Sequence, residues 1–279
     1  MKTVQRTLLA ILFAAATAAF GADGIAFITN IKGDISVDGN VRPVLLSELA
    51  RGQRIVVGKE SQASVMYIAS GKEYILRGPA DYTVRDTEIS GSAAMPPVTR
   101  DTAWRTTNKV LAQVGQTSAA SVRMRSIGKP KAPDEMKLIY PTQGAVATLQ
   151  PTFQWRADDP RVQGEFMLLA VGREKPLHLA KAAGGSYRIP AKLLAPDTEY
   201  AWTVAVAGNE LGSGRFRTLA PDALAEVERR RPAAKADFSD RLLFALMLHE
   251  MGAVQEARES WARLAQERGD LPELAAFAK

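Results

Sequence analysis

Short hydrophobic runs separated by glycine-containing turns dominate the chain from residue 24 to about residue 98. Runs of this kind, rich in β-branched and aromatic side chains, predict strands. We expect these strands at residues 25–28, 34–37, 54–57, 63–68, 73–76 and 82–84. Asp38-Gly39 and Ser70-Gly71 suit hairpin turns, because glycine reaches positive φ without a Cβ clash. The pattern therefore predicts an all-β domain over residues 23–98.

A second β region is predicted over residues 138–220. Phe153-Gln-Trp155 alternates as an inner strand does, with a buried indole, and further strands are expected at residues 166–171, 200–206 and 214–218. Residues 99–137, which lie between the two β regions, carry 8 basic and 3 acidic side chains. Their glycine, serine and proline content predicts an extended basic linker.

After residue 220, the spacing of the hydrophobic residues changes to the period of an α-helix. Proline, acidic and glycine residues mark the expected ends. We expect helices over about residues 221–231, from Asp237 or Ser239 to Gly252, and over residues 253–268, with a short fourth helix from about residue 271. The fold class is therefore multidomain and mainly β, with an α-helical C-terminus.

Each of the three regions resembles a known family. The frame Gly33-Asp34-Ile35, Gly52, Gly58, Gly71 and Ile75-Leu76 resembles the FecR domain, a periplasmic module of bacterial iron-citrate regulators. Those regulators carry a cytoplasmic anti-sigma segment, whereas only seven residues precede the first apolar run, residues 8–20, here. The resemblance therefore implies the FecR fold without its control of transcription.

The other two resemblances concern residues 138–220 and 221–279. The run from Leu194 to Val206, with Tyr200 at a tyrosine-corner position, resembles a fibronectin type III-like sandwich. Domains of this fold normally bind other molecules or hold neighbouring domains apart. The helix pair, with Gly252 at its turn and Trp261 at an aromatic position, resembles one tetratricopeptide repeat. A single repeat cannot bury its own hydrophobic face, so it must pack on its own domain, on flanking helices or on a partner.

The first 22 residues predict a secretory signal peptide. Lys2 and Arg6 form a positive segment, the run 8–20 is apolar but short for a membrane span, and small residues precede Ala22. An uncleaved anchor is the alternative. We expect export to the periplasm or cell envelope, and no transmembrane span after cleavage.

The composition argues against several kinds of chemistry. The chain has no cysteine, and its 2 histidines, His178 and His249, fall in different predicted domains. A thiolate site, a His-based triad or a His metal site is therefore hard to assemble. The net charge of +6 comes mainly from the linker, which argues against a nucleic-acid partner. We predict a protein that is not an enzyme and has no cofactor, catalytic residue or metal ligand.

The predicted function is binding. We expect an envelope adaptor with a protein partner on the C-terminal helices and a possible glycan or cell-wall polymer partner. Candidate contacts are Arg123, Arg125, Lys129 and Lys131 in the linker and Arg229, Arg230 and Arg231 near a helix end; the alternative for both groups is a solvated basic segment. Two alternative functions are a periplasmic signalling or sensory component of a FecR-type system and an enzyme with an unrecognised acid/base site.

Overall fold

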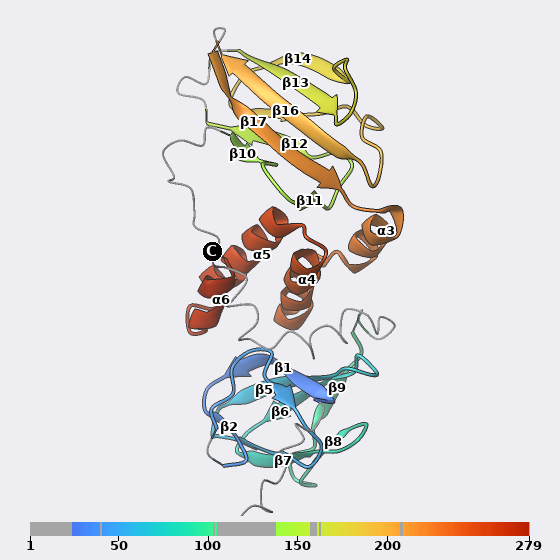
Figure 1. Cartoon of the computed structure of the whole chain (residues 1–279). Helices are drawn as coiled ribbons and strands as arrows, with labels where there is room; N and C mark the ends of the chain where they lie inside the picture. Colours follow the sequence, from blue (N-terminus) through green and yellow to red (C-terminus); the bar gives the residue numbers. More distant parts are fainter. Residues whose placement is uncertain are drawn as a thin grey trace, which may run out of the picture.

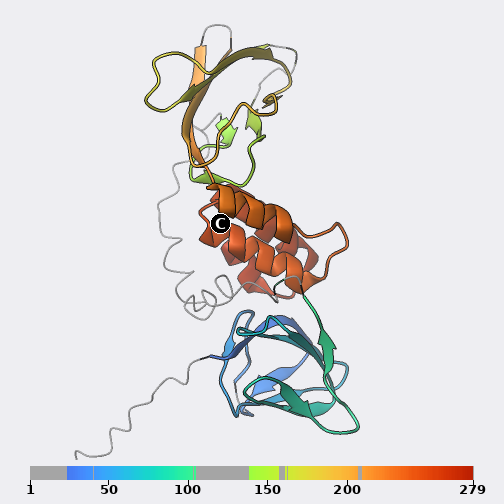
Figure 2. The same ribbon diagram turned by 90° about the vertical axis from the view of Figure 1, so that its right-hand side faces the viewer.

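The computed structural model describes residues 24–39, 41–102, 104, 138–156, 161, 163–206 and 209–278. It contains a first β unit (residues 24–102), a second β unit (residues 138–219) and a helical segment (residues 221–278). The helical segment is last in the sequence but lies between the two β units (Figures 1 and 2). The chain is mainly β, and its described helices all belong to the C-terminal segment.

The first β unit consists of two antiparallel sheets. Their strand orders are β3-β1-β5-β6-β9 and β2-β4-β7-β8. The strands are β1 (Ala26–Lys32), β2 (Ile35–Val37), β3 (Glu48–Leu49), β4 (Arg54–Val57), β5 (Gln62–Tyr67), β6 (Glu73–Arg77), β7 (Ala80–Val84), β8 (Ile89–Gly91) and β9 (Val98–Arg100). Alternate side chains of both sheets share one core, which includes Ile28, Val65, Ile55 and Val84.

The six strands expected in the first β unit all form. Both predicted turns are confirmed, since Gly39 and Gly71 adopt positive φ in them. The sequence did not predict β3, β8 or β9. Each has only two or three residues, and unlike β2 none contains two buried apolar side chains that flank a polar one. Strand β9 pairs with β6, so Thr99 and Arg100 belong to this unit and not to the predicted linker.

The second β unit is a sandwich of two sheets, with strand orders β10-β12-β15 and β11-β17-β16-β13-β14. The strands are β10 (Leu138–Tyr140), β11 (Ala145–Val146), β12 (Thr152–Trp155), β13 (Gly164–Ala170), β14 (His178–Ala182), β15 (Ser186–Arg188), β16 (Glu199–Val206) and β17 (Asn209–Thr218). Phe153 packs edge-on against Phe166 and Trp202, with ring centroids 4.8 and 4.9 Å apart. Trp155 is also buried, as predicted.

Tyr200 confirms a local prediction for the second β unit. Its ring is buried, and its hydroxyl accepts a hydrogen bond of 2.8 Å from the backbone N–H of Ala195, five positions earlier. The polar tip of a buried tyrosine therefore fixes the chain that leads into β16.

The helical segment contains α3 (Pro221–Arg230), α4 (Phe238–Glu250), α5 (Val254–Glu267) and α6 (Pro272–Phe277), which confirms the four predicted helices. Helix α4 is buried on nearly every side, from Leu242 to Leu248. A helix that is apolar all round belongs inside a structure. Trp261 of α5 is buried and packs against Phe277, with ring centroids 4.8 Å apart.

The first β unit and the helical segment share one hydrophobic cluster. Phe27, Leu46, Met66 and Trp104 pack with the residues of α4 and α5. Polar contacts surround this cluster: Arg268 donates to Asn30 Oδ1 at 2.6 Å and to the Ile31 carbonyl. The face that a lone helix pair leaves uncovered is therefore partly covered by the chain itself.

Arg100 adds an ionic connection between the first β unit and α4. It donates to Glu73 at 2.7 Å and to Asp240 at 2.8 Å, and it lies 2.7 Å from Asp237. Glu73 is buried and also accepts a hydrogen bond of 2.6 Å from Thr29. Burial alone would lower the pKa of Arg100, but the hydrogen bonds and charges of Asp240 and Glu73 raise it above its ordinary value.

The second β unit meets the start of α5. Backbone N–H groups of Ala145 and Thr142 donate to the Gly252 carbonyl and to Gln255 Oε1, at 2.9 and 2.8 Å. Glu256 Oε1 accepts from Tyr140 Oη at 2.7 Å and from the Ala147 N–H at 2.9 Å. The helical segment is thus fixed to both β units.

Candidate functional site

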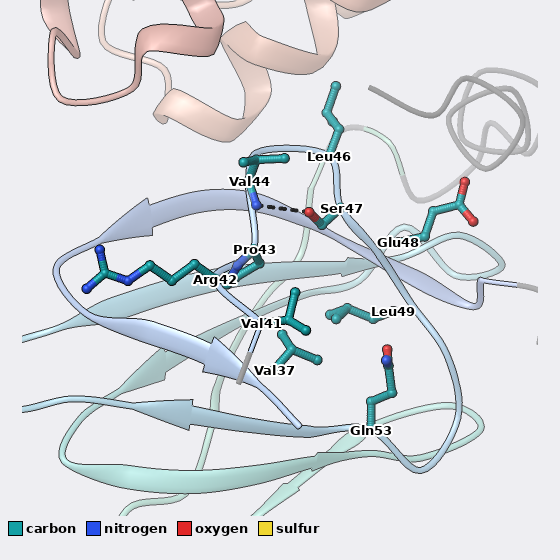
Figure 3. A pocket seen from close by; sticks show the side chains of 10 residues that line it. All are labelled: Val37, Val41, Arg42, Pro43, Val44, Leu46, Ser47, Glu48, Leu49 and Gln53. Carbon is teal, nitrogen blue, oxygen red and sulfur yellow. Dashed lines mark hydrogen bonds between the residues drawn. The ribbon is translucent and has the colours of Figure 1, made fainter. Parts of the chain in front are cut away.

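The first β unit has an apolar hollow of about 500 Å³ between the edge strands of its two sheets (Figure 3). Val37 of β2 and Leu49 of β3 lie on its two sides, and the loop that joins these strands supplies Val41 and Val44. Val41 and Val44 are 62% and 45% exposed. The hydrogen bond drawn in Figure 3, from the Val44 N–H to Ser47 Oγ, lies within the loop itself. The hollow offers apolar surface and few converging polar groups.

A second concave region runs along the helical segment. Two hollows of about 390 Å³ and about 300 Å³ share Arg231, Phe244, Ser260 and Arg263 as lining residues. Because they share these walls, we treat them as one feature, the helical groove. The remaining lining residues are Ala147, Thr148, Val227, Pro232, Ala233, Ala234, Arg241, Leu248, Glu256, Glu259 and Leu264.

Local sequence explains how three helices build the groove. Pro232 follows α3, where a helix cannot continue, and the turn brings Arg231 to the groove. Ser260 and Arg263 are three positions apart on α5, so they share one face of that helix. Phe244 comes from α4 and is 7% exposed, so it gives the groove an aromatic wall.

The three predicted contact arginines at the end of α3 have different surroundings. Arg230 is buried: its guanidinium lies 5.1 Å from the ring centroid of Trp104 and donates to Glu226 at 2.8 Å. Arg229 also pairs with Glu226. Arg231 lines the groove, where it pairs with the exposed Glu228 at 2.7 Å and lies 5.9 Å from the Phe244 ring centroid. Of the three, Arg231 alone lines the groove, while Arg230 packs inside the protein.

The predicted linker contacts Arg123, Arg125, Lys129 and Lys131, like the predicted signal peptide, lie outside the described residues. The groove contains two further arginines that sequence reasoning did not single out. Arg241 donates twice to Glu267, at 2.5 and 2.7 Å. Arg263 is exposed and donates to the neutral Ser260 Oγ at 3.3 Å. The sequence places each arginine on the polar face of its own helix. Nothing in the sequence indicated that these two faces meet Arg231.

Comparison with protein-family models and with curated proteins finds no match for this chain. In the described part of the chain, no group of three or more His, Asp or Glu side chains is arranged to hold a metal ion. The described helices also include none with the length and hydrophobicity needed to cross a membrane.

Glu256 connects the groove to the second β unit. Its Oε1 accepts the two hydrogen bonds from Tyr140 and Ala147, whereas its buried Oε2 has no hydrogen-bond partner among the described residues. Burial raises the pKa of Glu256, although the Ala147 N–H and the Tyr140 hydroxyl oppose that rise. Glu256 therefore offers one buried acceptor oxygen beside the groove that it lines.

Proposed function

We propose that this chain is an exported, non-catalytic adaptor of the bacterial cell envelope, and that it binds a protein partner in the helical groove. Export is inferred from the signal-like sequence of residues 1–22. The binding role is inferred from the groove, whose converging arginines and aromatic wall suit recognition. Arg231, Phe244 and Arg263 are the principal contact residues in this proposal.

The family resemblances form part of the same proposal. We assign residues 23–98 to a FecR-like domain, residues 138–220 to a fibronectin type III-like sandwich and residues 221–279 to a tetratricopeptide-like segment. The hydrogen bond between Tyr200 and Ala195 supports the second assignment. The antiparallel α4–α5 pair with Gly252 at its turn, at positive φ, supports the third.

One observation carries the proposal: the helical segment contacts both β units, but the groove stays open. Both ends of the segment are fixed, by Arg100 and Arg268 at the first β unit and by Glu256 at the second. A rigid groove loses little conformational entropy when a partner binds. The β units therefore act as supports that hold a preformed binding surface.

Site-specific photo-crosslinking in living cells tests this function. A photoreactive amino acid is placed at Ala234, an exposed residue that lines the groove, and at Arg258, an exposed residue of α5 outside the lining set. We expect a defined crosslinked protein from position 234 that is absent from position 258, in the envelope fraction. Equal crosslinking from both positions, or none from position 234, would contradict the proposal.

A further inference from the structure

The helical groove carries opposite charges toward its two ends. The hollow beside the connection between α3 and α4 is lined by Arg231, Arg241 and Arg263, and none of its described lining residues is acidic. The hollow beside the second β unit adds the carboxylates of Glu256 and Glu259. A ligand that matches this groove must therefore carry a negative group and a positive or N–H group, separated along its length.

Arg263 and Glu256 are the groups with unused binding capacity. No acidic partner is assigned to Arg263 within the described residues, and its guanidinium has five N–H donors in a fixed plane. Glu256 Oε2 is buried and has no hydrogen-bond partner in the part of the chain that the structure describes. A buried acceptor without a donor is costly, so a ligand that donates to Oε2 gains more than a surface contact would.

The spacing of these two residues sets the length of the ligand. They are seven positions apart on α5, which corresponds to about 10 Å along the helix axis. A polyproline II segment rises about 3.1 Å per residue and returns to the same face every third residue. Residues i and i+3 of such a segment therefore span about 9 Å and face the same way. Phe244 lies in the wall of both hollows, where an apolar residue of the ligand can contact it.

We propose that the helical groove binds an extended segment of a protein partner in which a basic and an acidic residue stand three positions apart, with apolar residues between them. The acidic side chain pairs with Arg263 and Arg231. The basic side chain donates to Glu256 Oε2 beside Glu259. This inference rests on the proposed function and specifies the chemistry of the partner.

An ion pair between Glu259 and Arg263 within α5 would compete with the ligand for these two side chains. The two residues have the i,i+4 spacing that favours an ion pair, but Arg263 donates to Ser260 instead. An exposed pair of this type is weak, so it does not block a ligand that satisfies both ends of the groove.

Fluorescence anisotropy with the purified mature chain tests the inference. The probes are labelled peptides with the cores Lys-Pro-Leu-Glu and Glu-Leu-Pro-Lys, in about 0.15 M salt, where charges beyond about 8 Å are screened. We expect one order to bind in a saturable way. Replacing either its Lys or its Glu by Gln should weaken binding about tenfold, the effect of losing one charged hydrogen bond. A peptide with only one charge that binds equally well would overturn the inference.

Matched variants locate the binding site. Arg263→Gln and Glu259→Gln should each weaken the preferred peptide about tenfold, while Arg258→Gln on the same helix should leave it unchanged. The combined Arg263→Glu and Glu259→Arg exchange should abolish the preference for one peptide order, because the new charges oppose Arg231 and Glu256, which stay in place. No effect from Arg263→Gln, or an unchanged preference in the exchange variant, would overturn the inference.

Two further outcomes separate this inference from the function on which it rests. If position 234 crosslinks but neither peptide binds, the proposed segment with a basic and an acidic residue is wrong. The adaptor function is not contradicted by that result. Soluble cell-wall fragments that bind more tightly than both peptides, and lose binding in Arg263→Gln, overturn the choice of a protein partner. Loss of the crosslink itself contradicts the adaptor function.

Discussion

Arg100→Met should strongly destabilise the junction between the first β unit and the helical segment. The Glu73 side chain is 2% exposed, and Arg100, at 22% exposed, is its cationic partner. Removing one member of a buried ion pair costs about 3–5 kcal/mol, because the other charge stays buried. The partial exposure of Arg100 lets water reach Glu73 in the variant, so we expect a loss of about 3 kcal/mol in the free energy of unfolding.

Equilibrium urea unfolding, followed by tryptophan fluorescence, measures this loss. Trp104 is 1% exposed and belongs to the hydrophobic cluster at the same junction, so its emission reports on the contact. The control is Arg51→Met, which removes an ion pair with Asp86 whose side chains are 73% and 63% exposed. Exposed pairs contribute about 0–1 kcal/mol, so the control should change stability little.

A second substitution separates charge burial from lost packing. Glu73→Gln keeps an oxygen that accepts from Thr29 but removes the charge that Arg100 balances. Adding it to Arg100→Met should recover at least half of the roughly 3 kcal/mol, because the uncompensated buried charge is the main cost. A single-variant loss below about 1 kcal/mol, or no recovery in the double variant, would refute the reasoning.

Three further predictions concern the second β unit and its junction with α5. Gly214→Ala places a Cβ 2.4 Å from Trp202 Nε1 and 2.9 Å from the Pro141 carbonyl oxygen, which accepts a hydrogen bond from that indole. We expect urea unfolding to show a loss of about 2–4 kcal/mol in the free energy of unfolding. The control, Gly269→Ala, places its Cβ in open space and should change stability little. Tyr200→Phe removes the hydrogen bond to the Ala195 N–H and should cost about 1 kcal/mol, and an unchanged midpoint would count against that bond. Burial raises the pKa of Glu256, so the stabilising contribution of this residue is present at low pH and is lost as pH rises from about 4.3 through the folded pKa. The difference in the free energy of unfolding between the native chain and Glu256→Gln should therefore shrink over that range. Parallel curves of stability against pH for the two proteins would contradict the prediction.

Local signals in the sequence predicted the helices and most of the longer strands. Pro221 and Gly252 mark helix ends through backbone chemistry that needs no tertiary context. Tyr200 was placed correctly because its ring and hydroxyl make contacts a few residues away. Strand β9 was missed, since its register is set by pairing with β6 more than twenty positions earlier and its own side chains show little alternation.

The helical groove could be predicted only in part. Arg231 was singled out from its cluster of charge, but the same cluster included Arg230, which is buried against Trp104. Nothing local distinguishes these neighbours, because their exposure depends on which side of α3 faces the rest of the protein. Arg263 and Phe244 reach the groove only because α3, α4 and α5 pack together, a contact between elements that periodicity does not specify.

The position of the helical segment changes how its function must be tested. A lone helix pair invites deletion of residues 221–279 as a test of partner binding. In this structure that deletion would also uncover Phe27, Leu46 and Met66 on the first β unit and would leave Arg100 without Asp240. Loss of binding could then follow from exposed apolar surface and a damaged junction. Substitutions confined to exposed groove residues such as Arg263 avoid this ambiguity, because they leave both junctions intact while changing the surface that a partner would contact.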